Sequence, residues 1–539
     1  MSTDEGHPLS RRELRERRAA EEAAGILREA GAQRRKNPPE VPEKAVSDAE
    51  TERDSCAVSE PPEPTAPEPE RPGTRTRSRR FVGAMLAVVG VLAVLAAAGA
   101  GASLVQGPRV SSVQVDPAAA VESSGSRVVL TSNQALAEID PSQVTVTPET
   151  PFTVDAAGRM VGVRFTVPLD DDTEYTVTID GAESIGGGAA STLETSFTTP
   201  AAEIFVLQRD ADGDDTIFRS DLSGSTAVPV YTAGVIDDFR ATSTRLVVSV
   251  REDDASALYV ADRDGGNVQE LTLPGEGTVT GLQVSDQGDL VGYTYTDLDV
   301  SETEGRASVL FTASLREPDA DPAPMSVGDE EPSIASWRFV PDSSALLFVD
   351  FEGDLILYDA QAESPEPALL GTALSIDAVT RGTYTAFVER IDSEGGIQLD
   401  LTTGEETELV APSEDLGQAG RVLPVPGGGT IREFVRYAAD GLPEAQSVAF
   451  VDDGGASTSL LEVTGADGLL QTCVSPSGRY VAALVAPDLT TNSYGYEALQ
   501  PLPSILETHI VEIATGEEVS RLSGFDISWC EVGPWSGTT

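Results

Sequence analysis

The chain has 539 residues, of which 40% are hydrophobic, and a formal net charge of -53. Its length and apolar content exceed those of one ordinary domain, so we expect two or more folded units. A chain this acidic repels nucleic acid and anionic polymers at long range, so we expect no nucleic-acid partner, whereas basic partners and divalent cations remain compatible.

The charge divides the chain into two parts. Residues 1–80 contain 16 Lys+Arg and 17 Asp+Glu, which leaves 20 Arg, no Lys and 72 acids for the remainder. We interpret residues 1–80 as a cytoplasmic tail. Ser10 and Glu13 have capping-box spacing, and pairs such as Glu13 and Arg17 stand one turn apart, which predicts a helix over about 10–35. That helix is either a solvated charged helix or a docking helix for a cytosolic partner or the inner membrane surface.

A Pro- and Glu-rich stretch over 37–72 has hardly any large apolar residue and is typical of a disordered linker. The following run, "FVGAMLAVVGVLAVLAAAGAGASLV", covers 81–105 without a charge and is long enough to cross a bilayer. Arginines precede it in "RPGTRTRSRR", whereas only Arg109 follows closely. This asymmetry predicts a single-pass signal anchor with a cytoplasmic N-terminus and an extracytoplasmic C-terminus. A cleaved signal peptide is the alternative, but the segment before the run is too long for one.

Residues 108–200 alternate apolar and polar positions in short runs such as "RVSSVQVDP", "GRMVGVRFTVPL" and "TEYTVTIDG". Runs of this length between turn residues predict an antiparallel β-sandwich. With its closing "SFTTP", the segment resembles the bacterial Ig-like domains of surface-layer and wall-associated proteins. The resemblance implies a spacer or adhesive module without catalysis. The segment has no cysteine, so an intersheet disulfide is not expected.

From 203 to 539 the chain repeats a cycle of strand, acidic turn, strand, Gly-containing turn and strand. Units begin near residues 235, 278, 333, 375, 420, 468 and 525, and four strands in each such period are typical of a β-propeller blade. The stretches "VSDQGDLVGYTY", "VPDSSALLFV" and "VSPSGRYVAALV" resemble the TolB-type propeller repeat, in which a Ser-Pro-Asp-Gly turn precedes an apolar strand. The chain begins this region near Glu203 with a second strand and ends in "FDISWCEVGPW", a first strand without a blade. Joined, they predict a seven-bladed propeller closed by the C-terminal strand, which removes free sheet edges. The fold class is thus an all-β ectodomain.

Three acids in "RDADGDDTIFRSDL", Asp210, Asp212 and Asp214, have the spacing of a calcium loop. An EF-hand-type loop requires Gly at its sixth position and a helix on each side. This chain has Asp215 at that position and predicted strands on both sides. We therefore interpret the acids as the tip of a hairpin. They remain weak metal candidates.

Little catalytic chemistry is recognisable in the acidic part. His509 is its one histidine, and it lies in the apolar strand "THIVEI". No lysine, phosphate loop, G-x-S-x-G elbow or Cys-His zinc pattern is present there. The tryptophans at 337, 529 and 535 are interpreted as blade packing, with a sugar-stacking platform as the alternative. We expect no cofactor and no catalytic residue.

Cysteine usage agrees with an outside location. Cys56 is alone in the tail, whereas Cys473 and Cys530 occupy matching places in the first strands of consecutive predicted units. In the seven-blade closure these strands are neighbours, so an oxidising compartment should join the two thiols. Two separate buried thiols are the alternative.

Two classes of function follow from this organisation. The first is a non-enzymatic, membrane-anchored protein that presents the propeller at the cell envelope as a scaffold for a protein or another ligand. The alternative is an envelope hydrolase, of glycosidase or lactonase type, with carboxylates in the propeller channel. Propellers support both binding and catalysis, so the fold alone does not choose between them.

Overall fold

The computed structural model describes residues 107–534 apart from 211–212, 286–288, 302–303, 329, 360, 363–365, 391–395 and 496–497. The predicted tail helix, the linker, the predicted span and Trp535 lie outside these residues. Within the described ranges, no helix is both long and apolar enough to cross a membrane.

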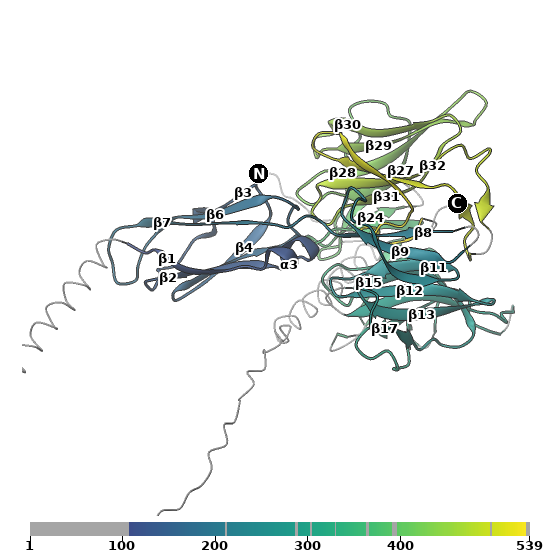
Figure 1. The fold of residues 1–539 in the computed structure, drawn as a ribbon, viewed down its shortest axis with the longest axis horizontal. Helices are drawn as coiled ribbons and strands as arrows, with labels where there is room; N and C mark the ends of the chain where they lie inside the picture. The colour runs from purple at the N-terminus through teal and green to yellow at the C-terminus, as the bar shows by residue number, and fades with distance from the viewer. Residues whose placement is uncertain are drawn as a thin grey trace, which may run out of the picture.

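The first unit is built from two antiparallel sheets, with strand orders β1-β2-β5-β4 and β3-β6-β7 (Figure 1). The alternation in the sequence places Val161, Val163 and Phe165 of β5 inside, and they share a core with Val177 and Ile179 of β6. The predicted β structure is confirmed. The strands are β1 Val110–Gln114, β2 Arg127–Ser132, β3 Val144–Thr147, β4 Phe152–Ala157, β5 Met160–Phe165, β6 Glu174–Ala182 and β7 Ser191–Thr198.

Two short helical segments in this unit were not predicted: α3 (Pro117–Glu122) and the 3-10 turn η1 (Pro141–Gln143). Each begins at the proline of an Asp-Pro pair, with the aspartate as its N-cap. The Asp116 side chain accepts a hydrogen bond from Ala119 N at 3.1 Å, and Asp140 does the same for Ser142 N at 2.9 Å. Asp as N-cap with Pro directly after it is a start signal for helical turns, so the sequence did contain the cue.

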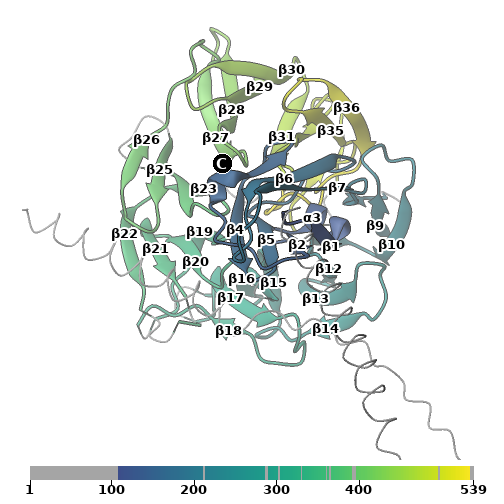
Figure 2. The same cartoon turned by 90° about the vertical axis from the view of Figure 1, so that its left-hand side faces the viewer.

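The second unit is a β-propeller, as predicted, and Figure 2 shows its sheets arranged in a ring. In the described residues it has six four-stranded sheets and one three-stranded sheet, which we call blades 1 to 7. Blade 1 is β11 Ile236–Ala241, β12 Arg245–Glu252, β13 Ala255–Asp262 and β14 Gln269–Leu271; blade 2 is β15 Gly277–Ser285, β16 Leu290–Asp297, β17 Val309–Ser314 and β18 Ala323–Pro324; blade 3 is β19 Ile334–Phe339, β20 Leu346–Asp350, β21 Asp354–Tyr358 and β22 Ala368–Thr372.

The remaining blades follow the same pattern, with the first strand of each nearest the channel and the last at the rim (Figure 2). Blade 4 is β23 Ser375–Val379, β24 Thr385–Glu389, β25 Gly396–Asp400 and β26 Glu406–Glu408; blade 5 is β27 Gln418–Pro424, β28 Thr430–Tyr437, β29 Pro443–Val451 and β30 Ser457–Thr464; blade 6 is β31 Gly468–Val474, β32 Tyr480–Ala486, β35 Glu507–Glu512 and β36 Glu518–Ser523, with the small hairpin β33 Tyr494–Gly495 and β34 Leu502–Pro503; blade 7 is β8 Ile204–Gln208, β9 Asp215–Ser220 and β10 Val228–Ala233.

The two ends of the propeller sequence meet in blade 7, but through a shorter contact than the predicted strand. Phe525 and Leu207 form an isolated β-bridge, with N–H to carbonyl distances of 2.9 and 3.0 Å. Ser528 N donates to Phe205 O at 2.9 Å. Asp526, between these contacts, has φ 53° and turns the chain out of an extended path. The C-terminal segment therefore closes the ring without adding a continuous fourth strand.

The first unit lies against one end of the propeller ring. Figure 1 shows its strands projecting from the side of the propeller, and Figure 2, which looks along them, shows them in front of the middle of the ring. We call this unit the sandwich, and the end of the propeller that it contacts the covered end. The opposite end is called the open end.

Candidate functional site

The covered end of the propeller is made of the turns that join the first and second strands of each blade. In the turn between β19 and β20, Ser343 Oγ donates to Val340 O at 2.9 Å and accepts from Ala345 N at 3.1 Å. In the corresponding turn of blade 6, Ser475 Oγ accepts from Tyr480 N at 2.9 Å. These are the turns that carry the TolB-like sequence resemblance, and their side chains hold them in fixed shapes. The sandwich therefore meets a preformed surface.

One contact between the two units is centred on Asp171, in the loop between β5 and β6 of the sandwich. Its side chain is buried and accepts from the Tyr480 hydroxyl at 3.2 Å. Arg479 Nη1 donates to Asp171 O at 2.9 Å and lies 3.3 Å from its carboxylate. Burial raises the pKa of Tyr480, and the nearby Asp171 carboxylate adds to the effect. The phenol therefore stays protonated as the donor to Asp171.

A second contact joins Ser124, after α3, to blades 3 and 4. Ser124 Oγ donates to Asp342 Oδ1 at 2.9 Å, and Arg381 Nη1 lies 3.0 Å from the same carboxylate. Arg381 Nη1 also donates to Ser124 Oγ at 3.1 Å. Ser124 and the Asp342 side chain are both buried. Because this contact and that of Asp171 engage different blades, the sandwich is held at more than one point around the channel.

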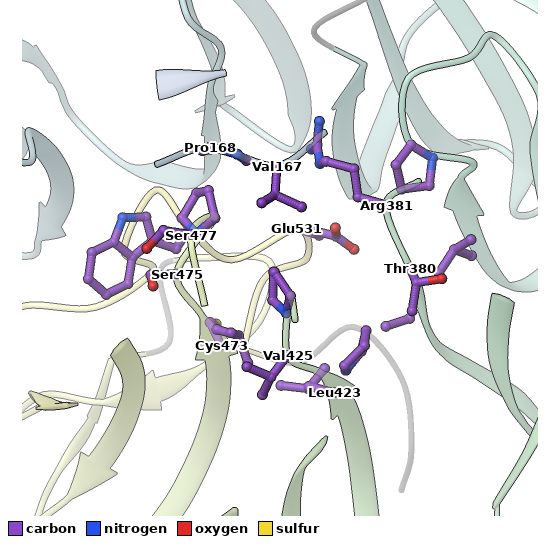
Figure 3. Close-up of a pocket in the computed structure, with 18 of the residues that line it drawn as sticks. Val167, Pro168, Thr380, Arg381, Leu423, Val425, Cys473, Ser475, Ser477 and Glu531 are labelled. Carbon is purple, nitrogen blue, oxygen red and sulfur yellow. The ribbon is translucent and has the colours of Figure 1, made fainter. Parts of the chain in front are cut away.

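Between the sandwich and the channel lies a cavity of about 700 Å³. Its walls are the covered-end turns, the channel ends of the first strands, and the loop of the sandwich that includes Val167 and Pro168. In Figure 3 the side chains of Val167 and Glu531 project into the space between the labelled residues of blades 4, 5 and 6. The volume is in the range of small-molecule pockets.

The first strands of blades 1 to 6 each contain a β-bulge where they pair with their second strands. The pairing shifts register between Ile236 and Asp238 in blade 1, between Thr280 and Gln283 in blade 2, and at the matching place in the other four blades. A bulge re-aims the side chains that follow it. Polar residues stand at or within two residues after each bulge, and we call one from each blade, six in all, the channel ring: Arg240, Gln283, Arg338, Asp377, Arg421 and Gln471.

Most members of the channel ring bond to the backbone of the next blade. Arg240 Nε donates to Leu282 O at 3.0 Å, Gln283 Nε2 to Trp337 O at 2.7 Å and Arg338 Nη2 to Asp377 O at 3.2 Å. Asp377 Oδ2 in turn accepts from Val422 N at 3.1 Å, and Gln471 Nε2 donates to Val532 O at 2.7 Å. These bonds connect successive blades around the channel.

Arg421 is the exception in this ring. Within the described part of the chain its side chain makes no hydrogen bond or ion pair, although it lies in the electrostatic range of Arg338, Asp377 and Glu433. It is half-buried and lines the cavity. Its five N–H donors are therefore available to another group.

The charged members of the ring differ in how they are compensated. Arg240 is almost fully buried and makes ion pairs of 2.8 Å with both Asp238 and Asp526. Arg338, 4% exposed, has no carboxylate within ion-pair distance among the described residues. Burial, together with the charge of Arg421, lowers the pKa of Arg338 to about 10. Burial also raises the pKa of Asp377 to about 6, against the opposing charge of Arg421.

Of the described residues that the sequence singled out, Trp529 and the two cysteines line this cavity, and the others do not. Asp210 and Asp214 lie in the turn between β8 and β9, as the hairpin interpretation predicted, and Asp212 lies outside the described residues. His509 lies on β35, the third strand of blade 6, where its Nδ1 is 3.1 Å from Glu518. Cys473 and Cys530 form the predicted disulfide, with Cα atoms 5.2 Å apart, and both line the cavity.

The described tryptophans pack within and between blades. Trp337 is buried with Phe339, at a ring distance of 5.3 Å, in the core of blade 3. Trp529 stacks on Tyr480 at 6.1 Å with the rings nearly parallel. Trp529 thereby supports the tyrosine that holds Asp171 of the sandwich.

Sequence reasoning missed the channel ring, although a signal exists. Arg240, Arg338 and Arg421 each stand in the first strand of their unit, beside apolar neighbours, in a region with only 20 arginines. Arginines that recur in the first strands of several repeats of a propeller indicate a shared environment in the channel. A comparison of the repeats strand by strand would have found them.

No protein-family model matches this chain, and no curated protein matches its sequence. Among solved structures, the chain is similar to TolB from Acinetobacter baumannii, at 14% identity over 72% of this chain and 81% of that one, with a TM-score of 0.33. It is also similar to the β-propeller domain of Cps50 (Swd1) from Myceliophteria thermophila, at 13% identity over 54% of this chain and 87% of that one, with a TM-score of 0.36. These similarities concern the fold alone.

Proposed function

We propose that this protein is a non-enzymatic binding scaffold, anchored in the cell membrane by residues 81–105, whose propeller binds a protein partner outside the cell through its open end. The uncharged run with arginines on its N-terminal side supports the anchor and its orientation. The disulfide between Cys473 and Cys530 supports an oxidising compartment. The hydrolase alternative is not supported by His509, the one histidine of the acidic part, because this residue lies on the third strand of blade 6, outside the cavity.

The sandwich acts in this proposal as an Ig-like spacer that is also a cap. Its strand orders β1-β2-β5-β4 and β3-β6-β7 correspond to the A-B-E-D and C-F-G sheets of a constant-type immunoglobulin domain. Asp171 and Ser124 fix it to the covered end, as described above. A macromolecular partner therefore has access to the open end and not to the covered one.

The observation that carries the proposal is the distribution of exposed apolar side chains. At the open end lie the turns between second and third strands and the connections between blades, and Phe351 there is 71% exposed. Exposed apolar residues that gather on one side of a soluble domain mark interaction sites. Eight such residues of the described chain lie on or beside loops at this end: Leu298, Val300, Phe351, Leu374, Tyr437, Leu442, Tyr494 and Ile505.

Exposed acids share the loops of this end with the apolar residues, and this combination indicates the chemistry of the partner. A protein surface with apolar contacts and a basic rim complements this end, whereas an anionic lipid surface or a second copy of this acidic chain is repelled. We therefore propose that the partner is a basic protein. The acids at this end include Glu252, Asp253, Asp254, Glu352, Glu414, Asp415, Asp440 and Glu444.

The proposal is tested by cross-linking on intact cells with a membrane-impermeant, photoreactive maleimide. Glu352→Cys places the thiol at the open end, and Glu183→Cys places it at the far hairpin of the sandwich, beside Ile185. We expect both to be labelled from outside, but only Glu352→Cys to form a covalent complex with another protein. The yield should fall at high salt, because the contact is partly electrostatic.

Two matched substitutions test whether apolar contacts at the open end contribute to the complex. Phe351 and Ile185 are each 71% exposed. In the Glu352→Cys background, Phe351→Ser should reduce the cross-linked complex, whereas Ile185→Ser should not. Absence of labelling at both cysteines in intact cells would refute the orientation. Labelling without a complex specific to the open end would refute the docking surface.

A further inference from the structure

We propose that the cavity beneath the sandwich binds a small molecule through an anionic group, a carboxylate or a phosphate, held between Arg421 and Arg338. This site is separate from the open end and does not depend on the protein partner proposed above. It uses the one channel-ring side chain that has no structural bond in the described chain.

Arg421 differs from the rest of the channel ring in its side-chain hydrogen bonding. The side chains of the other five members bond to a neighbouring blade or to the closing segment, at 2.7 to 3.2 Å. Those bonds explain why polar residues stand at their positions. Arg421 has no such bond, although it stands in the bulge of β27 and lines the cavity, as Arg240, Gln283, Arg338 and Asp377 also do. A ligand in the cavity accounts for a guanidinium that the fold does not use.

The environment of Arg338 also favours a bound anion. Its Nη1 and Nη2 donate to the carbonyls of Trp337 and Asp377, and its buried Nε has no partner in the described residues. A buried guanidinium that bonds only to carbonyl groups has no ion-pair partner, and a buried charge without one is costly in a protein interior. Burial and the neighbouring Arg421 lower the pKa of Arg338 to about 10. A bound anion would compensate both arginines at once.

The nearby acids Asp377 and Glu531 do not form ion pairs with these two arginines. Asp377 lies beside both arginines but is not within ion-pair distance of either, and its Oδ2 is bonded to Val422 N. Glu531 is exposed and projects into the cavity (Figure 3). Elsewhere in the same channel Arg240 does pair closely, with Asp238 and Asp526. Separated donors and acceptors around a space of about 700 Å³ are arranged for a ligand between them.

The acids also indicate what the rest of the ligand presents. Carboxylates accept hydrogen bonds, so Asp377 and Glu531 suit hydroxyl donors on the same molecule. A hydroxylated acid, such as a sugar acid or a sugar phosphate, combines both features. The carboxylate and the phosphate share the chemistry that the arginines recognise, and both forms belong in the test.

The test measures the binding of glucuronate, glucose 6-phosphate and glucose to the ectodomain by calorimetry and by the shift of its melting temperature. We expect one or both anions to bind and to raise the melting temperature with concentration, and glucose to do neither. Arg421→Gln should weaken that binding by about tenfold or more, the usual effect of losing a charge-assisted hydrogen bond. Arg436→Gln, on the neighbouring β28 and paired at the surface with Glu462, is the matched control and should leave it unchanged.

A second variant tests the same site by a gain of binding. Asp377→Asn removes a negative charge beside the two arginines, while the amide oxygen can still accept from Val422 N. We expect it to strengthen anion binding. Failure of both anions to bind the wild-type ectodomain, or equal weakening by Arg421→Gln and Arg436→Gln, would overturn the proposal. Preference for one anion over the other identifies the group that the site takes.

Discussion

Replacing Cys530 with serine is expected to lower the free energy of unfolding of the propeller by roughly 4 kcal/mol. The disulfide joins Cys473 in β31 to the segment that closes blade 7, across a sequence separation of 57 residues. Cross-linking a loop of that length restricts the unfolded chain, and the cost of losing it follows from the loop length in the chain-entropy model. Urea-induced unfolding, followed by tryptophan fluorescence, measures the change.

The variant pair provides its own control. Cys473→Ser should cost the same as Cys530→Ser, and the double variant should cost no more than either single one, because all three lose the same bond. Reduction of the wild-type protein should reproduce the loss. A cost below about 1 kcal/mol in the single variants would contradict the role of the disulfide in ring closure, since that is an ordinary single-mutation effect.

Replacing Arg240 with methionine is expected to destabilise the propeller by about 3 to 5 kcal/mol, the range for removing one partner of a buried ion pair. Arg240 is 3% exposed and bonds to Asp238, Asp526 and Leu282 O at once. Burial already raises the pKa of Asp238 well above its usual range, although Arg240 opposes the shift. Without Arg240 the two carboxyl groups remain buried with no counter-charge.

Arg245 in the neighbouring strand of blade 1 is the matched control. Its ion pair with Asp262 is more than a third exposed on both sides. Arg245→Met should therefore cost about 1 kcal/mol or less. Equal effects of the two substitutions in the same unfolding experiment would show that the buried contacts around Arg240 do not stabilise the ring.

The repeat structure was accessible from sequence because each blade encodes its strands locally. The expected unit starts near 235, 278, 333 and 375 coincide to within one residue with the first residues of β11, β15, β19 and β23. Alternation and turn residues act over a few positions, so single-sequence reasoning can find them. The pairing of Cys473 with Cys530 followed from the same repeat alignment.

Other features depend on contacts that the sequence does not display. Asp171 and Tyr480 meet across 309 positions, so the docking of the sandwich on the covered end was not predictable from local patterns. The channel ring depends on β-bulges, which shift single side chains toward the channel without a clear sequence signature. Because 72 acids lie beyond residue 80, the sequence alone could not identify the few, such as Asp377, that lie in the channel.

The central claim is that the sandwich stays docked on the covered end and leaves the open end free. The rate of maleimide labelling of single cysteines introduced into the native sandwich and propeller tests it most directly, since Cys473 and Cys530 are held in their disulfide. Val167, at the propeller end of the sandwich, is 6% exposed, whereas Ile185, at its other end, is 71% exposed. We predict that Val167→Cys reacts far more slowly than Ile185→Cys and reaches the same rate only after unfolding in urea. Equal rates in the native protein would show that the sandwich does not cover the channel, and would contradict this account.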